Sequence, residues 1–338
     1  MSKISKLYSF IKTYSLVIVV ILLILFPLFY AYLKGLRSKE VCDIFYFGDA
    51  LQQMINGTSL GFVYALIAIG YTMVYGIIEL INFAHGEIYM IGAYLTFFFI
   101  ANFKLSAILS VILAVAATAL LGVIIELIAY RPLRSAPRLN LLISAIGVSI
   151  ILSYGSQIVF GPNPQSFPIH FENSPYEFLG VKINFIQVLI MLVSCALMAL
   201  LALFVKYTKI GMAMRACALD RTCAALMGIN VNFIISLTFA IGSALAAVGG
   251  ILVGIRYNEI QPTMGYLAGI KAFSAAVLGG IGSIPGAMLG GVLIGLMENL
   301  FSAYISSGYK DAFAFIVLIL VLLIKPSGLL KSEGRVKV

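Results

Sequence analysis

Stretches of about twenty consecutive apolar residues recur along this sequence, and they constrain its fold more than any other feature. An α-helix needs about 20 residues to cross the roughly 30 Å hydrocarbon core of a bilayer. Apolar residues make up 62% of the 338 residues and charged residues 10%, whereas a soluble domain carries about 25% charged residues. The sequence therefore predicts a polytopic integral membrane protein and excludes a soluble enzyme, a secreted disulfide-bonded domain and a disordered chain.

The positions of these stretches predict an all-α transmembrane helical bundle with about ten spans. The stretch near 268–281 is short, so a short or re-entrant helix is expected there. The first stretch, Tyr14–Leu33, is too long for a signal peptide and is expected to remain as a membrane anchor. The other stretches cover residues 53–78, 88–103, 105–129, 139–160, 183–205, 233–255, 286–305 and 312–324.

Basic residues indicate the orientation of the chain. Most of the 22 Lys and Arg residues lie in the leader and in segments 130–138, 206–232 and 325–338, which ten spans place on one side. Short cytoplasmic loops of membrane proteins are enriched in Lys and Arg. Both termini are therefore expected in the cytoplasm, and the net charge of +9 is attributed to orientation and not to nucleic-acid binding.

No sequence motif for hydrolysis or metal binding is present. The chain contains no G-x-x-x-x-G-K-[ST], H-E-x-x-H or G-x-S-x-G pattern, and its four cysteines lack metal-ligand spacing. We therefore expect no catalytic residue, no metal site and free thiols.

The segment ELINFAHGE, residues 79–87, is an unusually polar joint between apolar stretches. Glu79, Asn82 and His85 recur at a spacing of three, close to one face of a helix, and Glu87 follows them. Charged side chains at membrane depth normally face protein or water. One interpretation is a polar lining or gate of a solute path. The other is a hydrogen-bonded knot at a helix joint, with His85 satisfied by Asn82 or by a carboxylate.

Two further features concern charge and small residues inside the apolar stretches. Glu126 lies near the end of its stretch and is expected to be a snorkelling or interfacial residue. Small residues four apart, as at Gly242, Ala246, Gly250 and Gly254, predict close helix packing. A Gly/Pro break can direct a helix amino terminus into the membrane. On this basis four residues are further candidates for the solute path: Gly282, Ser283, Pro285 and Gly286.

The segment 206–232 is the longest internal loop, and its interior is compatible with a short surface helix. Arg215, Asp220 and Arg221 are its polar residues among Met, Ala and Leu. The apolar side of such a helix can dock in a groove of another protein. The alternative is a helix lying on anionic lipid.

Four segments resemble the high-affinity branched-chain amino acid permeases of bacterial ABC importers. Together the similarity extends over about residues 47–330. The segments are YALIAIGYTMVYGIIELINFAHGEIYMIGAY at 64–94, YRPLR and LISAIG within 130–147, RACALDRTCAALMGINVNFIISLTFAIGSALAAVGG at 215–250, and KAFSAAVLGGIGSIPGAMLGG at 271–291.

The resemblance implies an inner-membrane permease subunit that carries leucine, isoleucine or valine and binds no cofactor itself. It implies four kinds of partner: membrane lipid, a second related permease, two cytoplasmic ATPase subunits that bind the ATP, and an extracytoplasmic solute-binding protein. It also implies that 206–232 is the coupling loop that docks on an ATPase. The coupling residues carried over are Arg215, Asp220, Arg221, Ala225 and Gly228.

The resemblance divides the chain into a permease domain, 47–330, between two additions. Residues 1–46 form an amino-terminal extension with an extra anchor, and residues 331–338 form a basic cytoplasmic tail. Two alternatives stay open for the function. One is a permease of the same class for urea or short amides. The other is a channel or ion-coupled carrier that acts alone.

Overall fold

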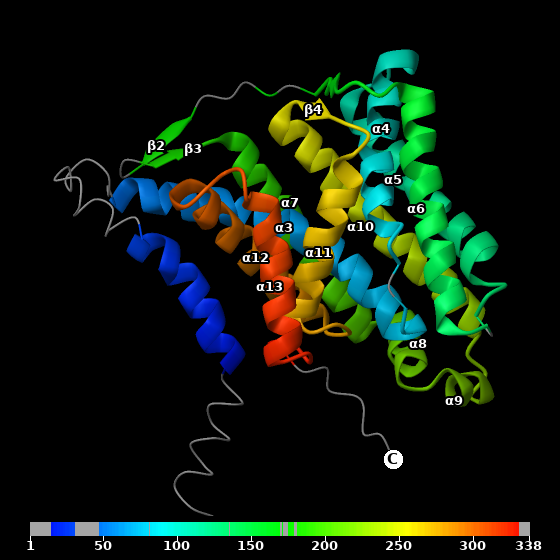
Figure 1. Ribbon diagram of the computed structural model, residues 1–338. Helices are drawn as coiled ribbons and strands as arrows, with labels where there is room; N and C mark the ends of the chain where they lie inside the picture. Colours follow the sequence, from blue (N-terminus) through cyan, green and yellow to red (C-terminus); the bar gives the residue numbers. More distant parts are fainter. Residues whose placement is uncertain are drawn as a thin grey trace, which may run out of the picture.

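The computed structural model describes residues 15–30, 47–80, 82–134, 136–169, 171, 175–178 and 181–330, and helices dominate this part of the chain (Figure 1). The predicted all-α class is therefore confirmed. The predicted tail 331–338 and residues 1–14 and 31–46 of the predicted extension lie outside the described residues.

The apolar stretches of the sequence correspond to helices. A first helix covers Ser15–Tyr30. The others are α3 (Phe47–Ile78), α4 (His85–Phe103), α5 (Ala107–Ile125) with a π-helical turn at Glu126–Tyr130, α6 (Arg138–Phe160), α7 (Phe185–Tyr207), α8 (Lys209–Leu219), α9 (Arg221–Leu226), α10 (Val231–Tyr257), α11 (Met264–Gly279), α12 (Ile284–Tyr304) and α13 (Lys310–Ile324).

Within the described ranges, seven helices are long and apolar enough to cross a membrane. These are α3, α4, α5 with its π-helical turn, α6, α7, α10 and α12. The predicted short helix near 268–281 is α11, with 16 residues. At 1.5 Å per residue it rises about 24 Å, which is less than the roughly 30 Å of a bilayer core. The ten-span count therefore stays a prediction.

Helices α3 and α10 form the centre of the bundle and are mostly buried, whereas α6 and α7 are mostly exposed. The exposed side chains of the outer helices are large and apolar, such as Ile158 and Leu192. Apolar side chains on the outside of a bundle are typical of helices that face lipid. The pattern fits a chain embedded in a membrane.

Two small antiparallel pairs of strands lie at the end of the bundle opposite α8 and α9 (Figure 1). In one, β1 (Gln165–Ser166) pairs with β4 (Glu259–Ile260), and in the other β2 (Tyr176–Phe178) pairs with β3 (Val181–Ile183). The two ends of the bundle are named the strand end and the α8–α9 end below.

Candidate functional site

Residues 79–84 form a non-helical joint between α3 and α4. Glu79 has a left-handed backbone conformation, with φ of 63°, directly after the end of α3 at Ile78. The expectation that Glu79, Asn82 and His85 share one face of a helix is therefore wrong. A left-handed residue is unfavourable within a helix, so the chain turns at Glu79 and α4 starts anew at His85.

Asn82 and His85 are both buried in the joint. The Asn82 Oδ1 atom accepts hydrogen bonds from the Tyr130 hydroxyl at 2.7 Å and from the Ala84 N–H at 3.0 Å. The His85 ring packs edge-on against Tyr71, and its Nε2 atom has no hydrogen-bond partner among the described residues. The hydrogen-bonded knot is thus present at Asn82. The expectation that Asn82 or a carboxylate satisfies His85 is wrong for Nε2.

Glu87 lies in the first turn of α4, at the wall of a cavity of about 750 Å³ between α4, α6 and α11. The residue is 1% exposed. The Ser149 hydroxyl donates a long hydrogen bond of 3.4 Å to Glu87 Oε1, and Oε2 has no partner in the described part of the chain. Of the eight sequence-predicted path residues, only Glu87 lines this cavity, which we call the Glu87 cavity.

Glu79 lies instead in a polar cavity of about 180 Å³. This cavity is also lined by Arg134 of the loop after α5 and by Arg221 of α9. The structure therefore places a predicted path residue beside a predicted coupling residue.

The turn at Gly282–Gly286 lies near α8. The Ser283 hydroxyl accepts a hydrogen bond from the Gly286 N–H at 3.2 Å and caps α12, and Pro285 follows in the first turn. Gly282 and Arg215 line a cavity of about 90 Å³. The structure thus places this turn beside the predicted coupling segment and not at the Glu87 cavity.

The predicted coupling loop contains two helices, α8 and α9, and its non-transmembrane part is residues 208–230. Thr208 caps α8 by accepting from the Gly211 N–H at 3.0 Å. Asp220 caps α9 by accepting from the N–H groups of Cys223 at 3.0 Å and Thr222 at 2.7 Å. These backbone hydrogen bonds, with one from the Cys223 thiol, hold the pKa of Asp220 below its ordinary value. The cap residues explain why two short helices form where the sequence predicted one.

The segment 208–230 presents an apolar and basic surface. All five predicted coupling residues are exposed: Arg215, Asp220, Arg221, Ala225 and Gly228. Leu226 is 82% exposed and Met227 83%. Large exposed apolar side chains beside charged ones are typical of a protein-binding surface.

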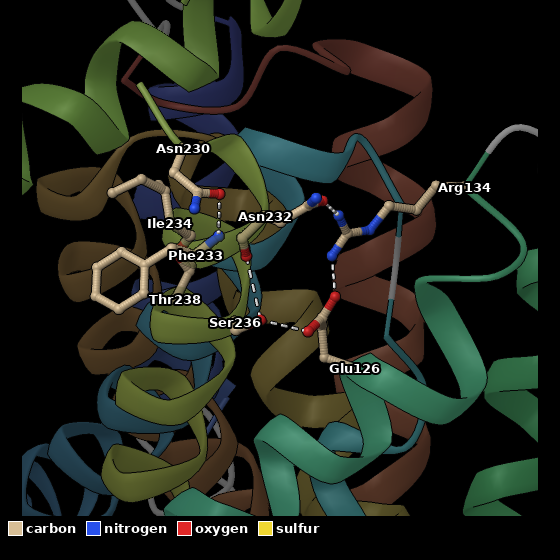
Figure 2. A network of polar contacts seen from close by, with 8 residues as sticks. All are labelled: Glu126, Arg134, Asn230, Asn232, Phe233, Ile234, Ser236 and Thr238. Atoms are coloured by element: carbon tan, nitrogen blue, oxygen red, sulfur yellow. Dashed lines mark hydrogen bonds and ion pairs between the residues drawn. The ribbon is translucent and has the colours of Figure 1, made fainter. Parts of the chain in front are cut away.

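A polar network joins the start of α10, directly after segment 208–230, to the end of α5 (Figure 2). Glu126, which is 0% exposed, forms an ion pair with Arg134 and accepts a hydrogen bond of 2.5 Å from the Ser236 hydroxyl of α10. Arg134 also donates to Asn232 at 2.6 Å, in the first turn of α10. Partners from two other segments bury Glu126 inside the protein, so it does not snorkel to solvent, and its position at the membrane interface stays a prediction.

A second charge cluster, buried at Lys271 and Glu298, lies between α11, α12 and α13. Lys271 contacts Glu298 at 2.9 Å and Asp311 at 2.6 Å, and Lys310 contacts Glu298 at 3.4 Å. None of these four residues is among the site residues predicted from the sequence. The available signal was the presence of Lys271 and Glu298 inside two apolar stretches.

Comparison with known proteins identifies the family. The family model described as the permease component of the branched-chain amino acid transport system matches residues 53–322. This chain belongs to that family. The resemblance inferred from the sequence motifs is therefore confirmed.

The permease has close curated relatives. The high-affinity branched-chain amino acid transport system permease protein LivH of Escherichia coli is 49% identical over 292 residues, which cover 83% of this chain and 95% of the relative. The corresponding protein BraD of Pseudomonas aeruginosa has the same identity and coverage. A probable branched-chain amino acid transport permease of Methanocaldococcus jannaschii is 32% identical over 78% of this chain and 87% of its own length. Among solved structures, PsaBC from Streptococcus pneumoniae aligns over 82% of this chain and 92% of its own, with a TM-score of 0.44 and 14% identity.

Proposed function

We propose that this chain is the membrane-spanning subunit of an ABC importer that moves leucine, isoleucine and valine across the inner membrane. The observation that carries the proposal is the 49% identity to LivH and BraD over 95% of their length. Both relatives are named as high-affinity branched-chain amino acid permeases.

The energy for transport comes from partner subunits in this proposal. The sequence has no phosphate-binding loop, so ATP is bound and hydrolysed by two ATPases on the cytoplasmic side. The apolar and basic surface of segment 208–230 supports an ATPase contact there. In this proposal the α8–α9 end and both termini face the cytoplasm. A second permease and a solute-binding protein on the outer side complete the importer.

The solute path runs along the joint between α3 and α4. Support comes from the buried polar groups of Asn82, His85 and Glu87, each of which has an atom without a hydrogen-bond partner in the described ranges. The turn Gly282–Gly286 stays a candidate for the inner end of this path, because it lies beside α8. Glu79, next to Arg221, belongs to the same inner end.

Two other functions make different predictions. A urea or short-amide permease of the same class would take up a neutral solute. A channel or ion-coupled carrier would need no ATPase partner.

Reconstitution tests these alternatives. The permease is purified in mild detergent with its candidate partners, placed in vesicles and supplied with radiolabelled leucine. We expect uptake that requires ATP and the solute-binding protein, and co-purification of the ATPases. Uptake of urea in place of leucine, or leucine uptake by the isolated chain, would overturn the proposal.

A further inference from the structure

The Glu87 cavity has the size and the lining of a small-molecule site. Ligand sites commonly enclose about 300–1,000 Å³ and combine apolar walls with a few polar groups. The volume of about 750 Å³ lies within this range. Its apolar walls include Ile150 of α6 and Leu267, Ile270 and Phe273 of α11.

Glu87 lies deep in the bundle. The adjacent Gly86 packs against Gly265 and Gly269 of α11, and the His85 ring lies against Gly242 in the middle of α10. A carboxylate at this depth is costly unless a cation or hydrogen-bond donors neutralise it. Glu87 has one long hydrogen bond, to Oε1, and Oε2 has no partner in the described part of the protein.

The α6 wall of the Glu87 cavity carries a polar stripe. Ser149, Ser153 and Gln157 of α6 all line the cavity. Their spacing of four places them on one face of the helix. The cavity thus offers an unsatisfied carboxylate, a row of hydroxyl and amide groups, and apolar walls.

We propose that the Glu87 cavity is a transmembrane binding site for the zwitterionic amino acid, in which Glu87 pairs with the substrate ammonium group. Ser153 and Gln157 of the stripe donate hydrogen bonds to the substrate carboxylate. The apolar walls contact the branched side chain. The inference rests on the proposed function and assigns its substrate site, because an ammonium group brings a full positive charge to the Glu87 carboxylate, whereas urea or an amide brings only hydrogen-bond donors.

The first test is Glu87→Gln in the complete reconstituted importer. This change keeps the shape of the side chain and removes a buried charge, so a purely structural role predicts an unchanged or more stable protein. We expect leucine uptake to fall about ten-fold or more, because a hydrogen bond to a charged group contributes roughly that factor. Co-purification of the ATPases and the elution volume of the complex verify assembly.

A matched pair of neighbouring variants provides the control. Ile150 lines the cavity and is 52% exposed, whereas Ile151 does not line it and is 69% exposed. We expect Ile150→Trp to block uptake by filling the cavity and Ile151→Trp to leave uptake unchanged. This pair decides the question if Glu87→Gln does not assemble.

The outcomes separate this inference from the proposed function. If the wild-type importer does not take up leucine, the proposed function fails. If the wild-type importer takes up leucine and either Glu87→Gln or Ile150→Trp does so at the same rate, the Glu87 cavity is not the binding site. In that case a lipid chain or a helix of the second permease occupies it.

Discussion

Glu126 is fully buried near the end of α5, although its position in the sequence suggests an interfacial residue. Arg134, eight positions later, forms an ion pair with its first carboxylate oxygen. The Ser236 hydroxyl of α10 donates a hydrogen bond to the second oxygen. Removing one partner of a buried ion pair leaves an unpaired charge in a medium of low dielectric. Substituting one residue of this pair should therefore destabilise the protein more than substituting the exposed charged residues around it.

We expect Arg134→Met to destabilise the protein by about 3–5 kcal/mol, because Glu126 loses its counter-charge. Adding Glu126→Gln should restore most of the stability, since no unpaired charge then remains. The measurement is the temperature at which the purified protein in detergent loses its monodisperse elution peak. Arg131→Met, at an exposed arginine in the same loop, is the control and should leave this temperature unchanged. Equal effects of the two arginine variants would contradict the assignment.

At the scale of whole helices, the close contact between α3 and α12 depends on glycine residues. A Cβ atom at Gly295 would lie 2.3 Å from the Gly61 Cα, and one at Gly291 would lie 2.4 Å from the Ala65 Cα. Both neighbours are backbone atoms, which cannot move aside without shifting a helix. Close backbone approach at small residues is a general mode of helix association in membranes.

We expect Gly295→Ala to cost about 1–3 kcal/mol through overpacking of α3 against α12. Gly147 of α6 has open space where a Cβ would lie, so Gly147→Ala should be neutral or stabilise the helix by up to about 1 kcal/mol. Thermal stability in detergent of the two alanine variants, compared with the wild type, tests this. A stable Gly295→Ala protein would mean that the two helices are less tightly packed than described.

At the scale of the whole molecule, the proposed coupling segment and the Glu87 cavity are connected by continuous structure. Segment 208–230 leads directly into α10, whose first turns hold Arg134 and Glu126 through Asn232 and Ser236 (Figure 2). Helix α10 then continues past His85, two residues before Glu87. Helix α10 can thus transmit a displacement of α9 to the joint between α3 and α4.

Gly228 is the turn residue of this route, with φ of 84°. We expect Gly228→Val to lower leucine uptake per ATP hydrolysed about five-fold or more, the range of typical coupling energies, because a β-branched residue disfavours this backbone conformation. Arg215→Ala should uncouple in the same direction by removing an exposed charge of the docking surface.

Gly228→Asn is the matched control, because asparagine tolerates the left-handed conformation, and it should retain most of the coupling. The ratio of uptake to ATP hydrolysis in reconstituted vesicles is the measurement. Wild-type ratios in both Gly228→Val and Arg215→Ala would exclude segment 208–230 as the coupling element.

The helical class and the positions of most helices follow from local properties of the chain. Runs of apolar residues are stable in lipid only as helices, because each backbone group is then satisfied within its own segment. The caps Thr208 and Asp220 accept hydrogen bonds from N–H groups two or three positions later, so capping is also a local property of the sequence. The family motifs likewise lie in contiguous segments, such as residues 64–94.

The pairing of polar groups depends on residues far apart in the chain. Nothing local to Glu126 reveals Ser236, and nothing local to Lys271 reveals Glu298 and Asp311. Periodicity placed Glu79, Asn82 and His85 on a helix face, but the left-handed turn at Glu79 separates them into different environments. Apolar length is a property of one segment, whereas burial of a charge is a property of all the segments around it. Helix content was therefore predictable from the chain alone, and the Glu87 cavity became visible only when α4, α6 and α11 were brought together.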